Sequence, residues 1–239
     1  MTTRLFMDDA YLKTAPAIVV RHTDEGGIVL DATILYARSG GQPGDSGVLH
    51  WPGGRLPIAT SVKGDGDEIV LIPSEPMALP DVGMQIEQHL QWDRRFAHMR
   101  VHTALHLLSV VVPLPVTGGA ITAEKGRLDF DMPEAPEDKD ALEYELNKLI
   151  QDDLEITESW ITDDELRANP GLIKTMSVMP PMGAGRVRLV RIGTAERQID
   201  LQPCGGTHVA RTSEIGPVTL GKIEKKGRQN RRMSVILAP

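Results

Sequence analysis

Two short motifs, far apart in the chain, hold histidine and cysteine residues at spacings that suit a metal ion. The segment HMRVHTALH places His98, His102 and His106 at successive four-residue steps. If this segment is helical, the three side chains project from one face, and two imidazoles one turn apart can bind the same tetrahedral zinc ion. The segment CGGTH places Cys204 four residues before His208. Its two glycines let the backbone turn both side chains toward one point.

Cys204 is the only cysteine of the 239-residue chain, so it cannot form an intramolecular disulfide. It is therefore buried filler, a nucleophile or a metal ligand, and the neighbouring histidine favours the ligand. Two helix histidines together with the CGGTH pair supply four soft or borderline ligands, a set that suits zinc. The predicted Zn²⁺ ligands are His102, His106, Cys204 and His208. His98 lies among three arginines in the sequence, and we assign it a solvated or substrate-facing role.

The histidine motif is also compatible with roles that involve no zinc. A histidine pair at this spacing occurs in protein cores and on surfaces, and that alternative stays open. A metalloprotease of the H-E-x-x-H type does not fit, because Thr103 occupies the position of the general-base glutamate. A zinc ion bound here would have to orient or polarise a substrate, or activate a water, without that carboxylate.

The elements that position these motifs fall into two parts with different patterns. Between residues 17 and 91, short β-branched runs such as AIVVR, GIVLDATILY and EIVLIP alternate with glycine-rich turns. This pattern is typical of a small antiparallel β-barrel. Near residue 92 the apolar period becomes helical, and Asp93 is a candidate cap for the helix that carries the histidines. We therefore predict a barrel domain over residues 1–92.

The second part, residues 93–239, mixes helices and strands. The segment EDKDALEYELNKLIQDD has leucines at helical spacing and acidic residues in its first turn, where the helix dipole favours them. Strand candidates are GRLDFDM, LEITESWIT, RVRLVRI and RQIDLQ, and the end of the chain is typical of a hairpin that turns near Gly227. The predicted fold class is α+β, with a small N-terminal antiparallel β-barrel followed by a domain in which helices pack on a sheet.

Composition and charge exclude several classes of protein. Hydrophobic residues make up 41% and charged residues 25% of the chain, which is ordinary for a globular protein. The apolar run VVVPLPV is far shorter than the roughly 20 residues of a membrane-spanning helix. The N-terminal segment carries acidic residues where a signal peptide has a basic region. We therefore expect a cytoplasmic protein with no membrane partner.

A net charge of −7 argues against a protein that coats nucleic acid, but one short segment is strongly basic. Six lysines and arginines stand between Lys222 and Arg232, opposed only by Glu224. Such a run is often a solvated strand edge or loop. It is equally consistent with a patch that confines a polyanionic partner to one face of an acidic protein.

The motifs HTALH and CGGTH, with SGGQPGDSG upstream and KGRQNRR near the end, resemble the editing domain of alanyl-tRNA synthetases and its free-standing relatives, the AlaX proteins. The resemblance spans most of the chain: residues 1–92 are similar to the glycine-motif barrel domain and residues 93–239 to the zinc-containing editing domain. It implies a trans-editing hydrolase that deacylates mischarged tRNA(Ala), chiefly Ser-tRNA(Ala) and in some members Gly-tRNA(Ala). It also implies the same four zinc ligands.

Further site residues follow from the resemblance alone. The stretch VTGGAITAEKGRLDF looks like the family segment that lines the amino-acid pocket, so Thr117 or Thr122 is a candidate contact for a serine hydroxyl. Gln42 belongs to the upstream loop expected beside the active site, with Gly40, Gly41 and Asp45. Ser39 stands where the family often has a glycine, so a slightly different loop shape is expected. The alternative is that these glycines only form tight turns.

With a tRNA(Ala) acceptor end as partner, the basic run becomes a candidate for phosphate contacts. The predicted tRNA-binding residues are Lys225, Lys226, Arg228, Arg231 and Arg232. Arg94, Arg95 and Arg100 are expected to extend that surface. Two other functions stay open: a non-catalytic RNA-binding module with a structural zinc, and a zinc hydrolase of small esters or amides. The oligomeric state is also open, with a monomer as one possible state.

Overall fold

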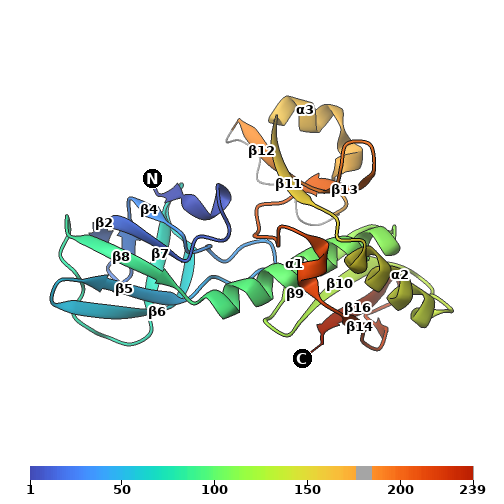
Figure 1. The fold of residues 1–239 in the computed structure, drawn as a ribbon, viewed down its shortest axis with the longest axis horizontal. Coiled ribbons are helices and arrows are strands. Elements are labelled where there is room, and N and C mark those ends of the chain that lie inside the picture. The colour runs from blue at the N-terminus through green and yellow to red at the C-terminus, as the bar shows by residue number, and fades with distance from the viewer. Residues whose placement is uncertain (176–184, 239) are drawn as a thin grey trace. The chain divides into compact units, whose positions relative to one another are not determined.

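The computed structural model describes residues 1–175 and 185–238 and divides the chain into two compact units, Met1–Ala97 and His98–Pro239. The helix α1 (Trp92–Val111) begins in the first unit and continues into the second (Figure 1). No helix of the described residues is long and apolar enough to cross a membrane.

The first unit is a closed barrel in which every strand pairs antiparallel with its neighbours. In barrel order the strands are β2 (Thr14–His22), β3 (Ile28–Leu30), β7 (Ile69–Pro73), β6 (Gly54–Lys63), β5 (Gly47–Trp51) and β8 (Gln85–Leu90). A short parallel pair, β1 (Thr3–Arg4) with β4 (Ala32–Thr33), and a 3-10 turn at Leu5–Met7 complete this unit. The barrel predicted from the β-branched runs is confirmed.

Alternation along the strands creates the barrel core. In β2, the residues Ala15, Ala17 and Val19 are buried while the residues between them are exposed, which is the period-two pattern of a sheet with one face inward. The segment from Ser39 to Gln42 forms a tight turn, in which the two ends exchange backbone hydrogen bonds of 3.2 and 2.9 Å. Gly40 and Gly41 have φ angles of 55° and 84°, so the turn requires both glycines, whereas Ser39 has no such requirement.

The described residues of the second unit form two sheets. The larger one has the strand order β14 (Val218–Leu220), β16 (Asn230–Leu237), β10 (Lys125–Asp131) and β9 (Val116–Ile121), with β15 (Glu224–Lys225) also paired to β16. The smaller one has the order β11 (Ile156–Thr162), β12 (Arg186–Gly193) and β13 (Gln198–Pro203). Within the part of the unit that the structure describes, the remaining helices are α2 (Lys139–Gln151), α3 (Asp163–Ala168) and two 3-10 turns at Pro170–Leu172 and Thr212–Ile215. The α+β fold class is confirmed.

The local sequence explains where these helices begin. The Asp138 carboxylate accepts a hydrogen bond of 2.8 Å from the Ala141 N–H and caps α2, which buries Leu146 and Ile150. Thr162 and Glu165 form a capping box at the start of α3. Asp93, in contrast, is not the cap that we expected, because α1 already begins at Trp92 and Asp93 lies within the first turn. It still faces the positive end of the helix dipole.

Candidate metal centre

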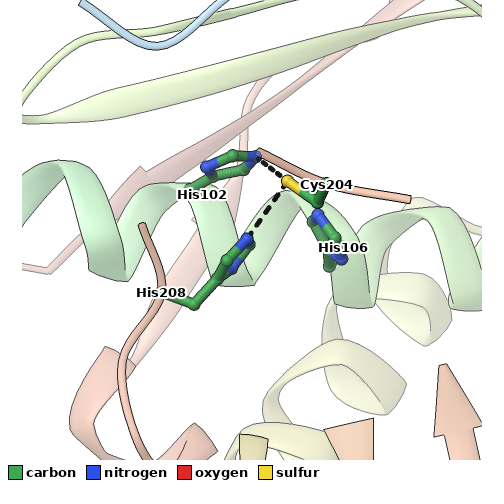
Figure 2. A group of neighbouring side chains, drawn as sticks. All are labelled: His102, His106, Cys204 and His208. Carbon is green, nitrogen blue, oxygen red and sulfur yellow. Dashed lines mark hydrogen bonds between the residues drawn. The ribbon is translucent and has the colours of Figure 1, made fainter. Parts of the chain in front are cut away.

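The four predicted ligands converge on one point in the second unit. His102 and His106 lie one turn apart on α1, and Cys204 and His208 come from the loop that follows β13 (Figure 2). One ligand atom from each residue lies within 4.8 Å of all the others. The histidines are buried and Cys204 is partly buried. The structure therefore brings together two motifs that lie far apart in the sequence.

The spacing of the ligand atoms fits a tetrahedral zinc ion. The Cys204 sulfur lies 3.5 Å from His102 Nε2 and 3.3 Å from His208 Nε2. For Zn–S and Zn–N bonds of about 2.3 and 2.0–2.1 Å, a tetrahedral angle places the sulfur and nitrogen about 3.6 Å apart. A thiolate with three imidazoles is also a donor set that zinc favours. These residues could therefore hold a metal ion.

A buried carboxylate orients His106. Asp200 lies on β13 and is 2% exposed, and its Oδ2 accepts a hydrogen bond of 3.0 Å from His106 Nδ1. Gln202 Nε2 donates to the same oxygen at 2.7 Å, and Lys174 Nζ donates to the other oxygen at 2.6 Å. With its Nδ1 bonded to Asp200, His106 presents Nε2 to the shared centre. Carboxylate–histidine pairs of this kind fix the tautomer and ring orientation of a metal ligand.

The Thr103 hydroxyl orients the imidazole of His208. Its hydroxyl donates a hydrogen bond of 2.9 Å to the Met99 carbonyl, so its oxygen accepts from His208 Nδ1 at 3.1 Å and from the Val209 N–H at 3.3 Å. Thr103 is fully buried. The residue that replaces the glutamate of a metalloprotease therefore positions an imidazole instead of acting as a base.

Arg188 holds the loop that carries Cys204. It lies on β12 and is 3% exposed, and its Nη1 donates to the carbonyls of Cys204 and Gly206 at 3.0 and 2.8 Å. Its Nε donates to Glu158 at 2.8 Å, so the charge is neutralised within the sheet. The Gly206 N–H points at the Cys204 sulfur at 3.4 Å. The thiol thus has a fixed backbone and one backbone donor.

The electrostatics of the cluster favour the thiolate of Cys204 and the neutral form of His208, whereas they favour the protonated form of His106. Burial alone raises the pKa of the Cys204 thiol, but the imidazoles of His102 and His208 reverse this effect and hold the pKa well below its usual value. Burial lowers the pKa of His106, yet its hydrogen bonds to Asp200 and Cys204 raise it to about 9. Burial and repulsion from His102 lower the pKa of His208 to about 3. Metal binding requires the thiolate and neutral imidazoles, so a bound cation would displace the proton of His106.

A cavity of about 550 Å³ borders the Asp200 network. Its polar lining includes Lys174 and Ser109, which also bond to the network: Lys174 to Asp200, and the Ser109 hydroxyl oxygen to Gln202 Nε2 at 3.5 Å. The rest of the lining is mostly apolar, and Ile173 is among its members. Lys174 therefore lines the cavity and also bonds to the carboxylate that orients His106.

The other predicted pocket residues have different surroundings. The Thr117 hydroxyl, on β9, lies 3.0 Å from the Asp129 carbonyl and 3.1 Å from Asn230 Oδ1. Thr122 is exposed at the β9–β10 turn, where its hydroxyl bonds to the backbone of Lys125. Gln42 is 1% exposed and belongs to the first unit. None of the three belongs to the group of four metal-ligand candidates.

The basic run separates into engaged and available cations. Arg232 forms a bidentate pair with Asp129 at 2.7 and 2.9 Å, and Lys226 pairs with Glu224 at 2.7 Å. Arg231 donates to the Pro133 and Asn230 carbonyls. Within the described part of the chain, Lys225 and Arg228 are exposed and have no ion-pair partner. The turn at Gly227, with a φ angle of 92°, occurs where the sequence predicted it.

Two expectations about exposed residues were wrong. Arg95 does not extend a cationic surface, because it is fully buried in the first unit and paired with Asp45, with a 2.8 Å hydrogen bond from Nε to Oδ2. In the sequence, an arginine at the start of a helix is typical of an exposed position. Only its contacts with Asp45 and the loop carbonyls of the first unit show that Arg95 is buried. His98 is 2% exposed, so the solvated alternative for it is also wrong.

Sequence reasoning missed the three residues that orient the ligands. Asp200 carried a misleading signal, because the alternation in RQIDLQ predicts Ile199 and Leu201 as the buried face, whereas the structure buries Asp200 and Gln202. Thr103 and Arg188 carried none, since their roles depend on contacts with residues far away along the chain. The spacing of residues within one segment does not reveal which residues of two strands lie opposite each other.

A β-barrel joined to an α+β unit with a Cys/His₃ cluster is the arrangement that the tRNA-editing resemblance predicts, and comparison with known proteins gives the family. The family model described as the threonyl and alanyl tRNA synthetase second additional domain matches residues 187–234. The alanyl-tRNA editing protein AlaX-M of Methanosarcina acetivorans is 33% identical, with 98% of each chain covered. That of Saccharolobus solfataricus is 31% identical over both full lengths.

A longer protein is also similar. The alanine–tRNA ligase of Pyrobaculum calidifontis is 34% identical across 94% of this chain, which spans 25% of that ligase. The chain therefore belongs to the family of alanyl-tRNA editing proteins, and the resemblance inferred from its motifs is confirmed.

Proposed function

We propose that this protein is a trans-editing hydrolase that deacylates mischarged tRNA(Ala), with Ser-tRNA(Ala) as its chief substrate and Gly-tRNA(Ala) as the second candidate. The observation that carries the proposal is the convergence of His102, His106, Cys204 and His208 in a chain that aligns over 98% of its length with a protein named for alanyl-tRNA editing. Residues 1–92 would then act as the glycine-motif domain and residues 93–239 as the editing domain.

We propose Zn²⁺ as the cofactor, bound by the four converging residues. A zinc ion at this position would supply a Lewis acid that orients or polarises the ester for attack by water. The chain's own part is to keep the ligands fixed: Asp200 aligns His106, Thr103 aligns His208, and Arg188 holds the backbone of Cys204. Such partners keep a site organised while a substrate enters and leaves.

Selectivity for serine follows from its hydroxyl. Serine differs from alanine by one polar group, and a synthetase pocket rejects such a near-isostere poorly. An editing site that hydrogen-bonds the hydroxyl would leave that partner unsatisfied with alanine, at a cost of about 1–3 kcal/mol.

Of the two candidate threonines, Thr117 suits this contact better. Its proton is directed at the Asp129 carbonyl or Asn230, so its oxygen keeps a lone pair that can accept from a substrate hydroxyl. The Thr122 hydroxyl, in contrast, both donates to and accepts from the backbone of Lys125. Gln42 remains a predicted site residue through the family motif alone.

The proposed partner is the acceptor end of tRNA(Ala), which would contact the basic run at residues 225, 226, 228, 231 and 232. Phosphate contacts position a nucleic acid without reading its bases. Among these residues, Lys225 and Arg228 have the charge most available for such contacts, because Arg232 and Lys226 already face carboxylates. Such contacts would place the ester near the metal centre while the rest of the tRNA stays outside.

The proposal is tested by the release of labelled serine from Ser-tRNA(Ala). Zinc-loaded protein should release serine quickly and should leave Ala-tRNA(Ala) intact. Release of glycine from Gly-tRNA(Ala), measured in the same way, should be slower than release of serine. Free seryl ethyl ester serves as a second substrate, because a hydrolase of small esters would cleave it equally well. A well-folded, zinc-loaded protein that releases no serine would contradict the proposal.

A second candidate function is an RNA-binding module with a structural zinc. It is favoured by the number of protein ligands, because sites closed by four side chains are commonly structural. In that case the protein would bind tRNA(Ala) and hydrolyse no ester. Loss of turnover on Cys204→Ala, with the unfolding transition of the second unit still present, would favour the hydrolase.

A further inference from the structure

An exposed tryptophan lies on the edge strand of the smaller sheet. Trp160 is 43% exposed although most large apolar residues of the second unit are buried. It lies on β11, which has a neighbour on one side only within the order β11-β12-β13. The residues on either side of it in the sequence, Ser159 and Ile161, are not fully buried either.

A cation from the next strand holds the indole. The Arg186 guanidinium carbon lies 4.5 Å from the centre of the Trp160 ring. This is a cation–π contact between diagonal neighbours, since Trp160 is paired with Arg188 and Thr162 with Arg186. Arg186 is exposed, and no carboxylate of the described residues forms an ion pair with it. The pair therefore presents an aromatic face and an available positive charge.

The strand register places this pair close to the metal centre. Trp160 lies opposite Arg188, and the Cys204 N–H bonds to the Arg188 carbonyl at 3.1 Å, one step beyond the last residue of β13. Trp160, Arg188 and Cys204 thus form one row across the sheet. Adjacent strands lie about 4.7–4.9 Å apart, so the backbones of Trp160 and Cys204 are separated by about 10 Å.

The same register places the indole on the side of the sheet that faces the metal ligands. Residues directly opposite in an antiparallel pair share a face, so Trp160 and Arg188 lie on the same side. The Arg188 side chain on that side bonds to the carbonyls of Cys204 and Gly206. Gln202 and Asp200, which contact His106, lie on this face as well, opposite Val190 and Ile192.

We propose that Trp160 and Arg186 form a binding site for the terminal adenine of the tRNA substrate, which stacks on this pair while its ester reaches the metal centre. The proposal rests on the proposed function. Every tRNA ends in an adenosine, and its base and the aminoacyl ester are attached to the same ribose. A base platform must therefore lie within one nucleotide of the ester-cleaving centre, and the row from Trp160 to Cys204 meets that requirement.

The chemistry of the pair fits a nucleobase next to a phosphodiester. Bases stack on indole rings and on guanidinium planes without regard to sequence, and an arginine beside the ring adds a contact for the backbone charge. Arg188 lies between the platform and the cysteine, but Glu158 neutralises it. Arg186 is the cation left to meet the substrate. The site would position the last nucleotide and leave amino-acid selection to the pocket.

The test compares two forms of uncharged tRNA(Ala), one intact and one with an abasic terminal nucleotide, in equilibrium binding to full-length, zinc-loaded protein. Trp160→Leu should bind the intact tRNA roughly 5- to 150-fold more weakly than wild type does, the usual effect of losing one base–aromatic stack. It should bind the abasic tRNA as wild type does. Trp160→Phe should recover most of the loss. Tyr144→Leu, which removes an aromatic residue 67% exposed on α2, should change neither affinity.

Two results would overturn the inference. If Trp160→Leu weakens both tRNAs equally, or neither, then the indole does not bind the terminal base, and this surface is free to serve a protein partner instead. Serine release by wild type, measured in the same preparations, separates this failure from that of the proposed function. Wild-type protein that neither binds tRNA nor releases serine overturns both proposals. If wild type releases serine normally and Trp160→Leu binds both tRNAs as wild type does, only this inference is overturned.

Discussion

Each compact unit buries a carboxylate against positively polarised nitrogens, and the two clusters differ in what their polar atoms face. In the barrel, Arg95 directs its Nε at Asp45 and its terminal nitrogens at Asp45 and the carbonyls of Ala10 and Ile34. In the second unit, Asp200 and Thr103 bond to one nitrogen of an imidazole and leave the other nitrogen directed at a common centre.

The difference separates a cluster whose polar atoms pair with one another from one whose lone pairs converge on a common centre. The Arg95 cluster ties the first turn of α1 to barrel loops and directs its donors at protein acceptors. The metal cluster leaves four electron-pair donors within 4.8 Å of one another. Such a group is costly to bury unless something outside the protein chain satisfies it. Buried polar residues thus indicate function when their lone pairs converge, and structure when they pair with one another.

Loss of one ligand should give the greatest change. Cys204→Ala removes the thiolate, and since loss of an outer partner alone typically costs 10- to 100-fold, serine release should fall by more than about 100-fold. Zinc content by atomic absorption should fall in parallel. Arg95 and the barrel should be unaffected, so the unfolding transition of the first unit is the internal control. A Cys204→Ala protein with full zinc content and rate would show that the thiolate belongs to no functional centre.

Breaking the structural cluster should affect stability and leave the metal in place. Arg95→Met leaves Asp45 buried without its cation, which typically costs 3–5 kcal/mol. Denaturant unfolding of the purified protein measures this loss. The zinc content per folded chain should stay that of wild type. If Arg95→Met loses zinc while it remains folded, the two clusters are not independent.

Thr103 allows a finer distinction within the metal cluster itself. Thr103→Val keeps the side-chain shape and removes the acceptor for His208 Nδ1, so zinc affinity should fall about 10- to 100-fold. Competition with a chromophoric chelator gives the affinity. Thr103→Ser restores the hydroxyl and should recover most of it. Equal zinc affinities in all three proteins would show that the hydroxyl does not position the imidazole.

The smallest expected effect is a change in the salt dependence of tRNA binding. In the basic run, some cations are paired with carboxylates and others are available to contact phosphate. Arg228→Gln should reduce the slope of log affinity for tRNA(Ala) against log salt by about 1, since it removes one phosphate contact. Arg232→Gln should leave that slope nearly unchanged, because Arg232 is engaged with Asp129. Binding measured over a series of salt concentrations distinguishes them. Equal changes in slope would mean that the pairing with Asp129 does not decide tRNA contact.

Much of the fold could be predicted from local pattern. The β-branched runs between glycine-rich turns indicated the barrel, and the leucine spacing indicated α2, because both periods are set by the residues of one element. The turn at Gly227 followed from the same punctuation. The strand β9, in contrast, was not predicted, since VTGGAI has two glycines that weaken a strand pattern. This segment is a strand because its backbone pairs with β10.

The four metal-ligand candidates could be predicted from residue type, whereas the residues that orient them could not. Histidine and cysteine are rare enough that two motifs suggested one centre, and the structure brings them together. Arginine is common and ambiguous, so Arg95 was assigned to the wrong environment. Thr103, Arg188 and Asp200 act through contacts with residues that are distant in sequence, and only strand register and helix packing bring these contacts about.

The role of His102, His106, Cys204 and His208 as the ester-cleaving centre can be decided by one titration. Zinc content and serine release from Ser-tRNA(Ala) are followed together, as a chelator withdraws the metal and added zinc restores it. We predict that the rate falls in proportion to bound zinc and returns with it, while circular dichroism shows the fold retained. A zinc-free, folded protein that releases serine at the full rate would contradict this role.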